Sequence, residues 1–341
     1  MIIAKTPFRI SFFGGGTDFP DYFVENGGCV LSTSIDKYCY VNIRNLPPFF
    51  DYNNEIVYSK IEQVKNLDDI NHPMVKNILK YFDIDNIKIS YDADLPARTG
   101  LGTSSSFAVG LINAISKLKN IKLEKKDISD LAIYVERELC KEEGGIQDQI
   151  AATFGGFNFI KFNKANKYDK KLFDKFGYSA YDYEINKIDI DNNILKTLNN
   201  NLFLFFTGIS RNSFEIQKNT QKSLKNNTTN LNHLNDMVDV SIKILKSNNI
   251  DDFGHLLNDA WKIKKSLSSS ISNNHIDDIY EKGINCGAIG GKILGAGGGG
   301  FILFYVPITN HEIFKSKMSD LMNVPFKFEN DGTSIIYESN D

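Results

Sequence analysis

The residues with the clearest capacity for chemistry lie at 95–106, which read L-P-A-R-T-G-L-G-T-S-S-S. The stretch follows a predicted strand at 87–91 and opens a predicted helix from Ser104, whose apolar residues recur at the 3.6-residue period. Glycines let the backbone approach a ligand closely, and the first turn of a helix offers free N–H groups to phosphate. The stretch therefore predicts a phosphate-binding loop, although a capped helix after a glycine turn stays open. Its candidate ligands are Gly100, Leu101, Gly102, Thr103, Ser104, Ser105 and Ser106.

A second glycine-rich loop ends the predicted strand at 2–13, which carries Arg9. Three glycines are followed by a hydroxyl and a carboxylate, a combination that can meet a polyol through backbone and side chain. The candidate substrate ligands here are Gly15, Gly16, Thr17 and Asp18. A plain hairpin or bulge suits glycine equally well, and for Asp18 taken alone that interpretation is favoured.

Two further carboxylates could serve a catalytic site. Glu136 lies beside the apolar stripe of a predicted helix at 127–142, which Asp127 is expected to cap. Asp148 follows the turn Gly144-Gly145, where rigid backbone can hold a catalytic carboxylate. The ordinary alternatives are a solvated surface glutamate and an N-cap for a short helix at 149–153.

Composition excludes several classes of function. A net charge of −3 over 341 residues, without a dense run of Lys and Arg, argues against nucleic acid as the main partner. The four cysteines are scattered and form no C-x-x-C pair, which favours a reduced, cytoplasmic setting. The five histidines have no zinc-ligand spacing, and the longest apolar runs are too short to cross a membrane.

The remaining pattern indicates an α+β protein, because strands and helices do not alternate regularly. A polar stretch at 163–201 is predicted to hold the boundary between an N-terminal domain at 1–190 and a C-terminal domain at 191–341. Further strands are expected at 29–43 (as a pair), 155–162, 202–206 and 301–306. Further helices are expected at 72–82, 213–224, 229–247, 251–265, 275–286 and 310–322.

A third glycine-rich stretch, at 292–300, matches G-x-G-x-x-G literally through Gly295, Gly297 and Gly300. A dinucleotide site needs a helix directly after those glycines, whereas a strand pattern follows here. A Walker A loop is also excluded, because Cys286 stands where its first glycine should be and Ile293 where its Ser or Thr should be.

Taken in order, the three glycine-rich stretches resemble those of the GHMP small-molecule kinase superfamily. The resemblance is greatest to the D-glycero-D-manno-heptose 7-phosphate kinases and covers nearly the whole chain. It is carried by T-P-F-R-I-S-F-F-G-G-G-T-D at 6–18, P-A-R-T-G-L-G-T-S-S at 96–105, G-I-Q-D-Q-I-A-A at 145–152, W-K-I-K-K-S-L at 261–267 and G-A-I-G-G-K at 287–292.

The resemblance implies an N-terminal lobe with a left-handed βαβ crossover and a ferredoxin-like C-terminal lobe. It also implies an ATP-dependent kinase that phosphorylates the anomeric hydroxyl of a heptose 7-phosphate. Asp148 would take or orient the proton of that hydroxyl, with Arg9 beside the reacting groups, and Ser104 and Glu136 would hold Mg²⁺. Candidate contacts to the phosphosugar are Asp18, Arg211, Lys262, Lys265, Gly297 and Gly298.

Two other classes of function remain open. The chain could be a related kinase for another sugar, such as L-fucose, or a non-catalytic sensor that binds sugar and ATP. Galactose is disfavoured, because Gly15 and Gly16 stand where galactokinases have Glu-His. The protein is expected to act as a monomer or homodimer, with a small phosphosugar and ATP as its partners.

Overall fold

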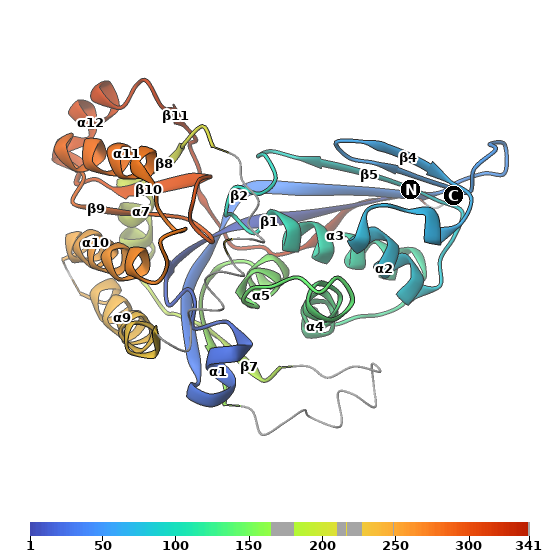
Figure 1. Cartoon of the computed structure of the whole chain (residues 1–341), viewed down its shortest axis with the longest axis horizontal. Coiled ribbons are helices and arrows are strands. Elements are labelled where there is room, and N and C mark those ends of the chain that lie inside the picture. Colours follow the sequence, from blue (N-terminus) through green and yellow to red (C-terminus); the bar gives the residue numbers. More distant parts are fainter. Residues whose placement is uncertain (165–180, 210–215, 217–226, 248, 340–341) are drawn as a thin grey trace.

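The computed structural model describes residues 1–164, 181–209, 216, 227–247 and 249–339. Figure 1 shows two halves, each built on its own β-sheet with helices packed against it. The predicted helix at 213–224 and the candidate Arg211 fall outside the described residues, apart from residue 216.

The larger sheet is organised around β1 (Ile2–Phe13) and β2 (Gly28–Asn45), which are antiparallel. The strand pair expected at 29–43 is a single strand of 18 residues, with register shifts against β1. Its length lets β2 pair along different stretches with four partners, which are β1, β5 (Ile87–Ala93), β6 (Phe157–Phe162) and β12 (Phe328–Glu329). The other strands are β3 (Asn54–Val57), β4 (Ile61–Val64) and β7 (Tyr183–Lys187).

Helices cover one face of this sheet, and α3 (Thr103–Leu118) lies against β1 and β2 (Figure 1). The helix predicted at 127–142 is divided into α4 (Lys125–Tyr134) and a π-helical turn at Val135–Leu139. Glu124 is the N-cap of α4, and Asp127 is the third residue of the helix, where its side chain accepts from Glu124 N in a capping box. The prediction that Asp127 is the cap was therefore wrong. The neighbouring helices are α1 (Pro20–Asn26), α2 (Pro73–Phe82) and α5 (Gln147–Phe154).

The smaller sheet has the strand order β11-β8-β10-β9, with every neighbouring pair antiparallel. Numbered along the chain, this order is 4-1-3-2, with helices after the first and third strands, which is the ferredoxin-like arrangement. The strands are β8 (Leu202–Phe206), β9 (Gly290–Ile293), β10 (Phe301–Tyr305) and β11 (Met322–Asn323). The helices are α7 (Asn192–Asn201), α9 (Thr228–Leu245), α10 (Asp251–Ser266), α11 (Asn274–Asn285) and α12 (His311–Lys317).

The end of the chain returns to the larger sheet. β12 (Phe328–Glu329) pairs with β2, and β13 (Ser334–Glu338) pairs with β1. Because Ile2 lies opposite Glu338, the two ends of the chain lie together at the end of this sheet (Figure 1). The proposed C-terminal domain at 191–341 therefore needs correction, because its last strands complete the N-terminal sheet. Sequence periodicity could not reveal this pairing, since two short strands carry no signal of their partner. Among the residues that the structure describes, no helix is long and apolar enough to span a bilayer.

Gly283 tests how tightly α11 packs on the smaller sheet. A methyl group at this position would overlap the ring of Phe304, which is fully buried and meets the ring of Phe314 at 5.7 Å. Overpacking of a core costs about 1–3 kcal/mol, more than the ~1 kcal/mol that alanine gains over glycine in a helix. We expect Gly283→Ala to lower the urea midpoint, while Glu281→Ala, at an exposed site on the same helix, leaves it nearly unchanged. A higher midpoint for Gly283→Ala would contradict this packing.

Candidate active site

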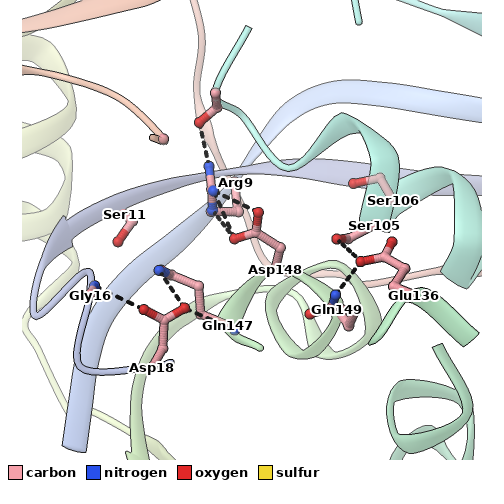
Figure 2. Close-up of polar contacts among 12 residues, drawn as sticks. Arg9, Ser11, Gly16, Asp18, Ser105, Ser106, Glu136, Gln147, Asp148 and Gln149 are labelled. Atoms are coloured by element: carbon pink, nitrogen blue, oxygen red, sulfur yellow. Dashed lines mark hydrogen bonds and ion pairs between the residues drawn. The ribbon is translucent and has the colours of Figure 1, made fainter. Parts of the chain in front are cut away.

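A forked ion pair between Arg9 and Asp148 forms the centre of the site (Figure 2). Arg9 Nε donates to Asp148 Oδ1 at 2.7 Å, and Arg9 Nη2 donates to Oδ2 at 2.8 Å. The Arg9 side chain is 5% exposed and the Asp148 side chain 23%, so the pair is largely shielded but still open on one side. Such two-point contacts fix both orientation and distance, which isolated surface pairs do not.

The backbone positions both members of this pair. Arg9 lies in β1, while Asp148 lies in the first turn of α5, so it does not cap a helix at 149–153. Arg9 also donates from Nη1 to the carbonyl of Gly100 at 2.7 Å, and its backbone N–H donates to Leu101 O at 3.1 Å. The glycine loop is thereby tied directly to the ion pair. A Cβ on Gly102 would lie 3.4 Å from both Arg9 Cγ and Asp148 Cγ, which explains a glycine there, with φ at +75°.

The predicted phosphate-binding stretch opens α3 as expected. Gly102 precedes the helix without a side-chain cap, so the N–H groups of Thr103, Ser104 and Ser105 have no acceptor within the helix. The Ser106 hydroxyl donates to Pro7 O at 2.9 Å, and its N–H donates to Gly102 O. Ser106 therefore joins α3 to β1, and the groups available to an anion come from the preceding three residues.

The glycine-rich stretches at 95–106 and 292–300 contact each other through their backbones. A side chain on Gly295 would overlap Gly100, and one on Gly300 would overlap Thr99 O. The N–H of Phe301 donates to Thr99 O at 3.2 Å. Loops almost 200 residues apart in sequence are in contact because neither carries a Cβ at the crossing. Gly297 and Gly298 instead pack against Ile271, whose carbonyl accepts from Gly298 N at 2.7 Å.

Asp18 lies beside the ion pair and is held by backbone and side-chain donors. Gly16 N donates to Oδ1 at 2.9 Å, and Gln147 Nε2 donates to Oδ2 at 3.0 Å (Figure 2). Burial raises the pKa of Asp18 above its ordinary value, against the lowering effect of these hydrogen bonds. Thr17 is fully buried, and its hydroxyl lies 2.8 Å from Gly14 O and 2.9 Å from Cys29 O, so it can donate to either carbonyl and hold the loop in place.

Glu136 occupies a separate buried corner, in the π-helical turn after α4. It accepts from Ser105 Oγ at 2.9 Å and from Gln149 Nε2, while its Oε1 has no hydrogen-bond partner among the described residues. Burial, and then the charge of Glu142, raises its pKa well above the ordinary value. Ser104, which was expected to share a metal with Glu136, is exposed, and Ser105 is the serine that meets it.

This corner fits a hard divalent cation in the chemistry of its donors. An unpartnered carboxylate oxygen and a hydroxyl are oxygen ligands of the kind Mg²⁺ prefers. Within the described residues no group of three or more His, Cys, Asp or Glu side chains could hold a metal ion alone. Mg²⁺ commonly keeps waters and takes its remaining ligands from phosphates, so one carboxylate is enough.

A cavity opens beside Arg9 and Asp148, between the two halves of the molecule. Gly15, Gly16 and Asp18, the candidate sugar contacts, line it together with Ser11 and Gln147. Ser11 Oγ and Gln147 Oε1 lack hydrogen-bond partners among the described residues. From the C-terminal half it is lined by Lys264, Leu267, Ile271, Lys292, Gly295 and Ala296.

The structure brings two unpredicted lysines to this cavity in place of Lys262 and Lys265. Lys262 pairs with Asp259 at 3.0 Å and Lys265 with Asp277 at 3.1 Å, both at exposed positions outside the cavity lining. Lys264 donates to Ile293 O at 3.0 Å and to Gly295 O at 2.5 Å, and Lys292 is buried in β9. A charged residue within an otherwise apolar strand was the signal in the sequence that could have identified Lys292.

Two models of known protein families match the chain, one in each half. The GHMP kinase N-terminal domain matches residues 70–156, and the GHMP kinase C-terminal domain matches residues 241–315.

Individual relatives extend the similarity over the whole chain. D-glycero-alpha-D-manno-heptose 7-phosphate kinase of Campylobacter jejuni is 32% identical over 92% of each chain. A crystal structure named as a D-glycero-D-manno-heptose 1-phosphate kinase from Bacteroides thetaiotaomicron superposes with a TM-score of 0.71 at 23% identity, covering 100% of both chains. A crystal structure of a putative sugar kinase from Campylobacter jejuni gives a TM-score of 0.70 at 26% identity, over 98% of this chain and 97% of that one.

These matches agree with the architecture. A ferredoxin-like C-terminal sheet is what the resemblance in the sequence implied. The dinucleotide-binding alternative is excluded, because Gly300 leads directly into strand β10. The chain belongs to the GHMP kinase superfamily, and within it to the sugar kinases.

Proposed function

We propose that the protein transfers the γ-phosphoryl group of ATP to the anomeric hydroxyl of D-glycero-D-manno-heptose 7-phosphate, giving the 1,7-bisphosphate. The observation that carries the proposal is the Arg9–Asp148 pair, held at a cavity where two glycine loops converge. The choice of sugar is supported by the Campylobacter jejuni relative, which is named for this substrate.

Asp148 serves as the acceptor for the attacking hydroxyl. Arg9 holds the carboxylate from one side, and the 23% exposure of the Asp148 side chain leaves lone pairs open to the cavity. The sugar oxygen bonds to the γ-phosphorus as the bond to the ADP oxygen breaks, and the hydroxyl proton passes to Asp148. Phosphoryl transfer of this kind depends mostly on positioning and on charge neutralisation, which Arg9 supplies at the reacting oxygens.

The nucleotide phosphates fit the start of α3. The N–H groups of Thr103, Ser104 and Ser105 lack acceptors in the helix, and the helix dipole favours an anion there. Mg²⁺ would be held by Glu136 with a serine hydroxyl, and it would neutralise charge on the triphosphate. Ser104, on the exposed side of the same turn, stays a candidate ligand beside Ser105.

The sugar contacts come from the loop after β1. Asp18, Gly15 and Gly16 line the cavity next to Asp148, while Thr17 supports the loop from behind. Lys262 and Lys265 already have carboxylate partners at the surface, so Lys264, which lines the cavity, is better placed for a phosphate. The role of Arg211 stays a prediction.

Substrate choice is tested by ADP release with Mg-ATP across a sugar panel. We expect turnover on D-glycero-D-manno-heptose 7-phosphate, and none on the 1-phosphate isomer, whose anomeric oxygen is blocked. Mannose 6-phosphate, L-fucose and galactose complete the panel. Turnover only on an unphosphorylated sugar would support a kinase but exclude the heptose phosphate as its substrate. The absence of turnover on every sugar would favour a non-catalytic sensor.

Replacement of Asp148 separates catalysis from binding. We expect Asp148→Asn to lower kcat about 10²- to 10⁴-fold, the usual contribution of a general base, while ADP binding by calorimetry stays within a few fold. Asp259→Asn is the matched control, because Asp259 pairs with Lys262 at an exposed site on α10. Equal kcat values for Asp148→Asn and the wild type would exclude a catalytic role for Asp148.

The metal assignment predicts a change in Mg²⁺ dependence. We expect Glu136→Gln to raise the Mg²⁺ concentration at half-maximal rate more than tenfold, because a neutral amide replaces the charged ligand. Stabilisation of the protein by Mg-ADP in thermal melts should fall in parallel. Comparison of Ser104→Ala with Ser105→Ala then identifies the second ligand as the serine whose loss shifts the Mg²⁺ curve. An unchanged curve for Glu136→Gln would contradict the site.

A further inference from the structure

Lys292 is a buried cation that the chemistry described so far does not use. It lies in β9, is 5% exposed, and lines the cavity together with Arg9. Its Nζ donates to Ser11 O at 3.1 Å and to Phe12 O at 2.6 Å, which joins the C-terminal half to β1. No carboxylate pairs with it among the described residues, since both contacts are backbone carbonyls.

An unpaired ammonium group is costly at such a site. Removing a charge from water costs several kcal/mol, and two carbonyl dipoles do not replace a counter-ion. The positive charge of Arg9 adds to the cost, and burial, with Arg9 second, lowers the pKa of Lys292 to about 7. The free protein therefore holds Lys292 largely as a neutral amine above that pH.

The charged neighbours of Lys292 come from three directions. Arg9 lies in β1, and Asp18 lies in the loop after that strand. Asp148 lies on α5, and Lys264 on α10 also lines the cavity. β10 adds only Tyr305 as a titratable residue, and it lies opposite Gly290 in the sheet. The buried residues of α11 are Ile276, Ile279 and Gly283, which carry no charge. Both carboxylates already accept hydrogen bonds, Asp148 from Arg9 and Asp18 from Gly16 and Gln147.

The hydrogen bonds of Lys292 leave one direction unused. A neutral amine has two N–H groups, and in Lys292 these donate to Ser11 O and Phe12 O. Its lone pair takes the remaining tetrahedral position, and protonation turns that position into a third donor. An anion that enters the cavity would both accept from this donor and stabilise the added charge.

We propose that Lys292 binds a phosphoryl oxygen of a substrate in the cavity beside Arg9, and takes a proton from solvent as the anion binds. This inference rests on the proposed function in one respect, that phosphate-bearing substrates occupy this cavity. The phosphoryl group belongs either to ATP or to the phosphosugar, and both offer the same chemistry to an ammonium group. Lys292 thereby contributes from the C-terminal half a charge that is absent until substrate arrives.

Proton uptake on binding tests the proposal in the unmodified protein. Isothermal titration at pH 8.5, in two buffers of different ionisation enthalpy, measures the protons taken up with each ligand. ATP with EDTA and D-glycero-D-manno-heptose 7-phosphate are titrated separately, since both are fully ionised at this pH. We expect uptake of about one proton with one of them, which identifies the source of the phosphoryl group, and almost none at pH 6.

Variants assign the proton to Lys292. Lys292→Arg keeps a permanent charge, so it should bind the same ligand without proton uptake. Lys292→Met should raise the KM for that ligand about 10- to 100-fold, the range for loss of a charged hydrogen bond, with the other KM unchanged. Lys262→Met, at an exposed position on α10, is the control and should change neither value.

The outcomes distinguish this inference from the proposed function. Uptake that persists in Lys292→Arg, or binding of both ligands by the wild type without uptake, would overturn the role of Lys292 and leave the kinase intact. If the heptose phosphate is the one substrate that gives no activity, it is excluded as the sugar, while the ATP titration still tests the role of Lys292. Failure of both ligands to bind would overturn both.

Discussion

The fork between Arg9 and Asp148 is the interaction on which the rest of the site depends. It joins β1 of the larger sheet to the first turn of α5, and a third nitrogen of Arg9 donates to the carbonyl of Gly100. One guanidinium group therefore fixes a carboxylate and a loop together. Because the pair is shielded from water, its geometry is maintained more strictly than that of a surface ion pair.

Close backbone packing is the second constraint. Gly100, Gly295 and Gly300 lie where the two halves meet, and a methyl group at any of them would overlap backbone of the opposite loop. The halves can approach only because these positions lack a Cβ. The cavity lies next to this crossing, so it receives Arg9 and Asp148 from one half and Lys264 and Lys292 from the other.

The site contains three groups whose charges are balanced in different ways: the Arg9–Asp148 pair, Asp18 and Glu136. Arg9 and Asp148 neutralise one another. Among the described residues, Asp18 accepts hydrogen bonds but has no cation as a partner, and Glu136 keeps one oxygen unpartnered. Glu136 lies in a π-helical turn, a feature often found at functional sites. Each group has a binding capacity that a phosphosugar, a nucleotide or a metal could use.

The sequence by itself determined the elements whose signal is local. β1, α3 and β10 begin and end close to the predicted residues, because apolar periodicity and glycine turns depend only on neighbours in the chain. The glycine stretches and the Asp148 and Arg9 candidates also followed from the sequence, largely through family resemblance. Tertiary structure alone decided which serine meets Glu136, that Lys264 and Lys292 replace Lys262 and Lys265 at the cavity, and that β12 and β13 return to the first sheet. These outcomes depend on the exact helical phase of a side chain or on pairing across 300 residues, and neither leaves a periodic trace in the sequence.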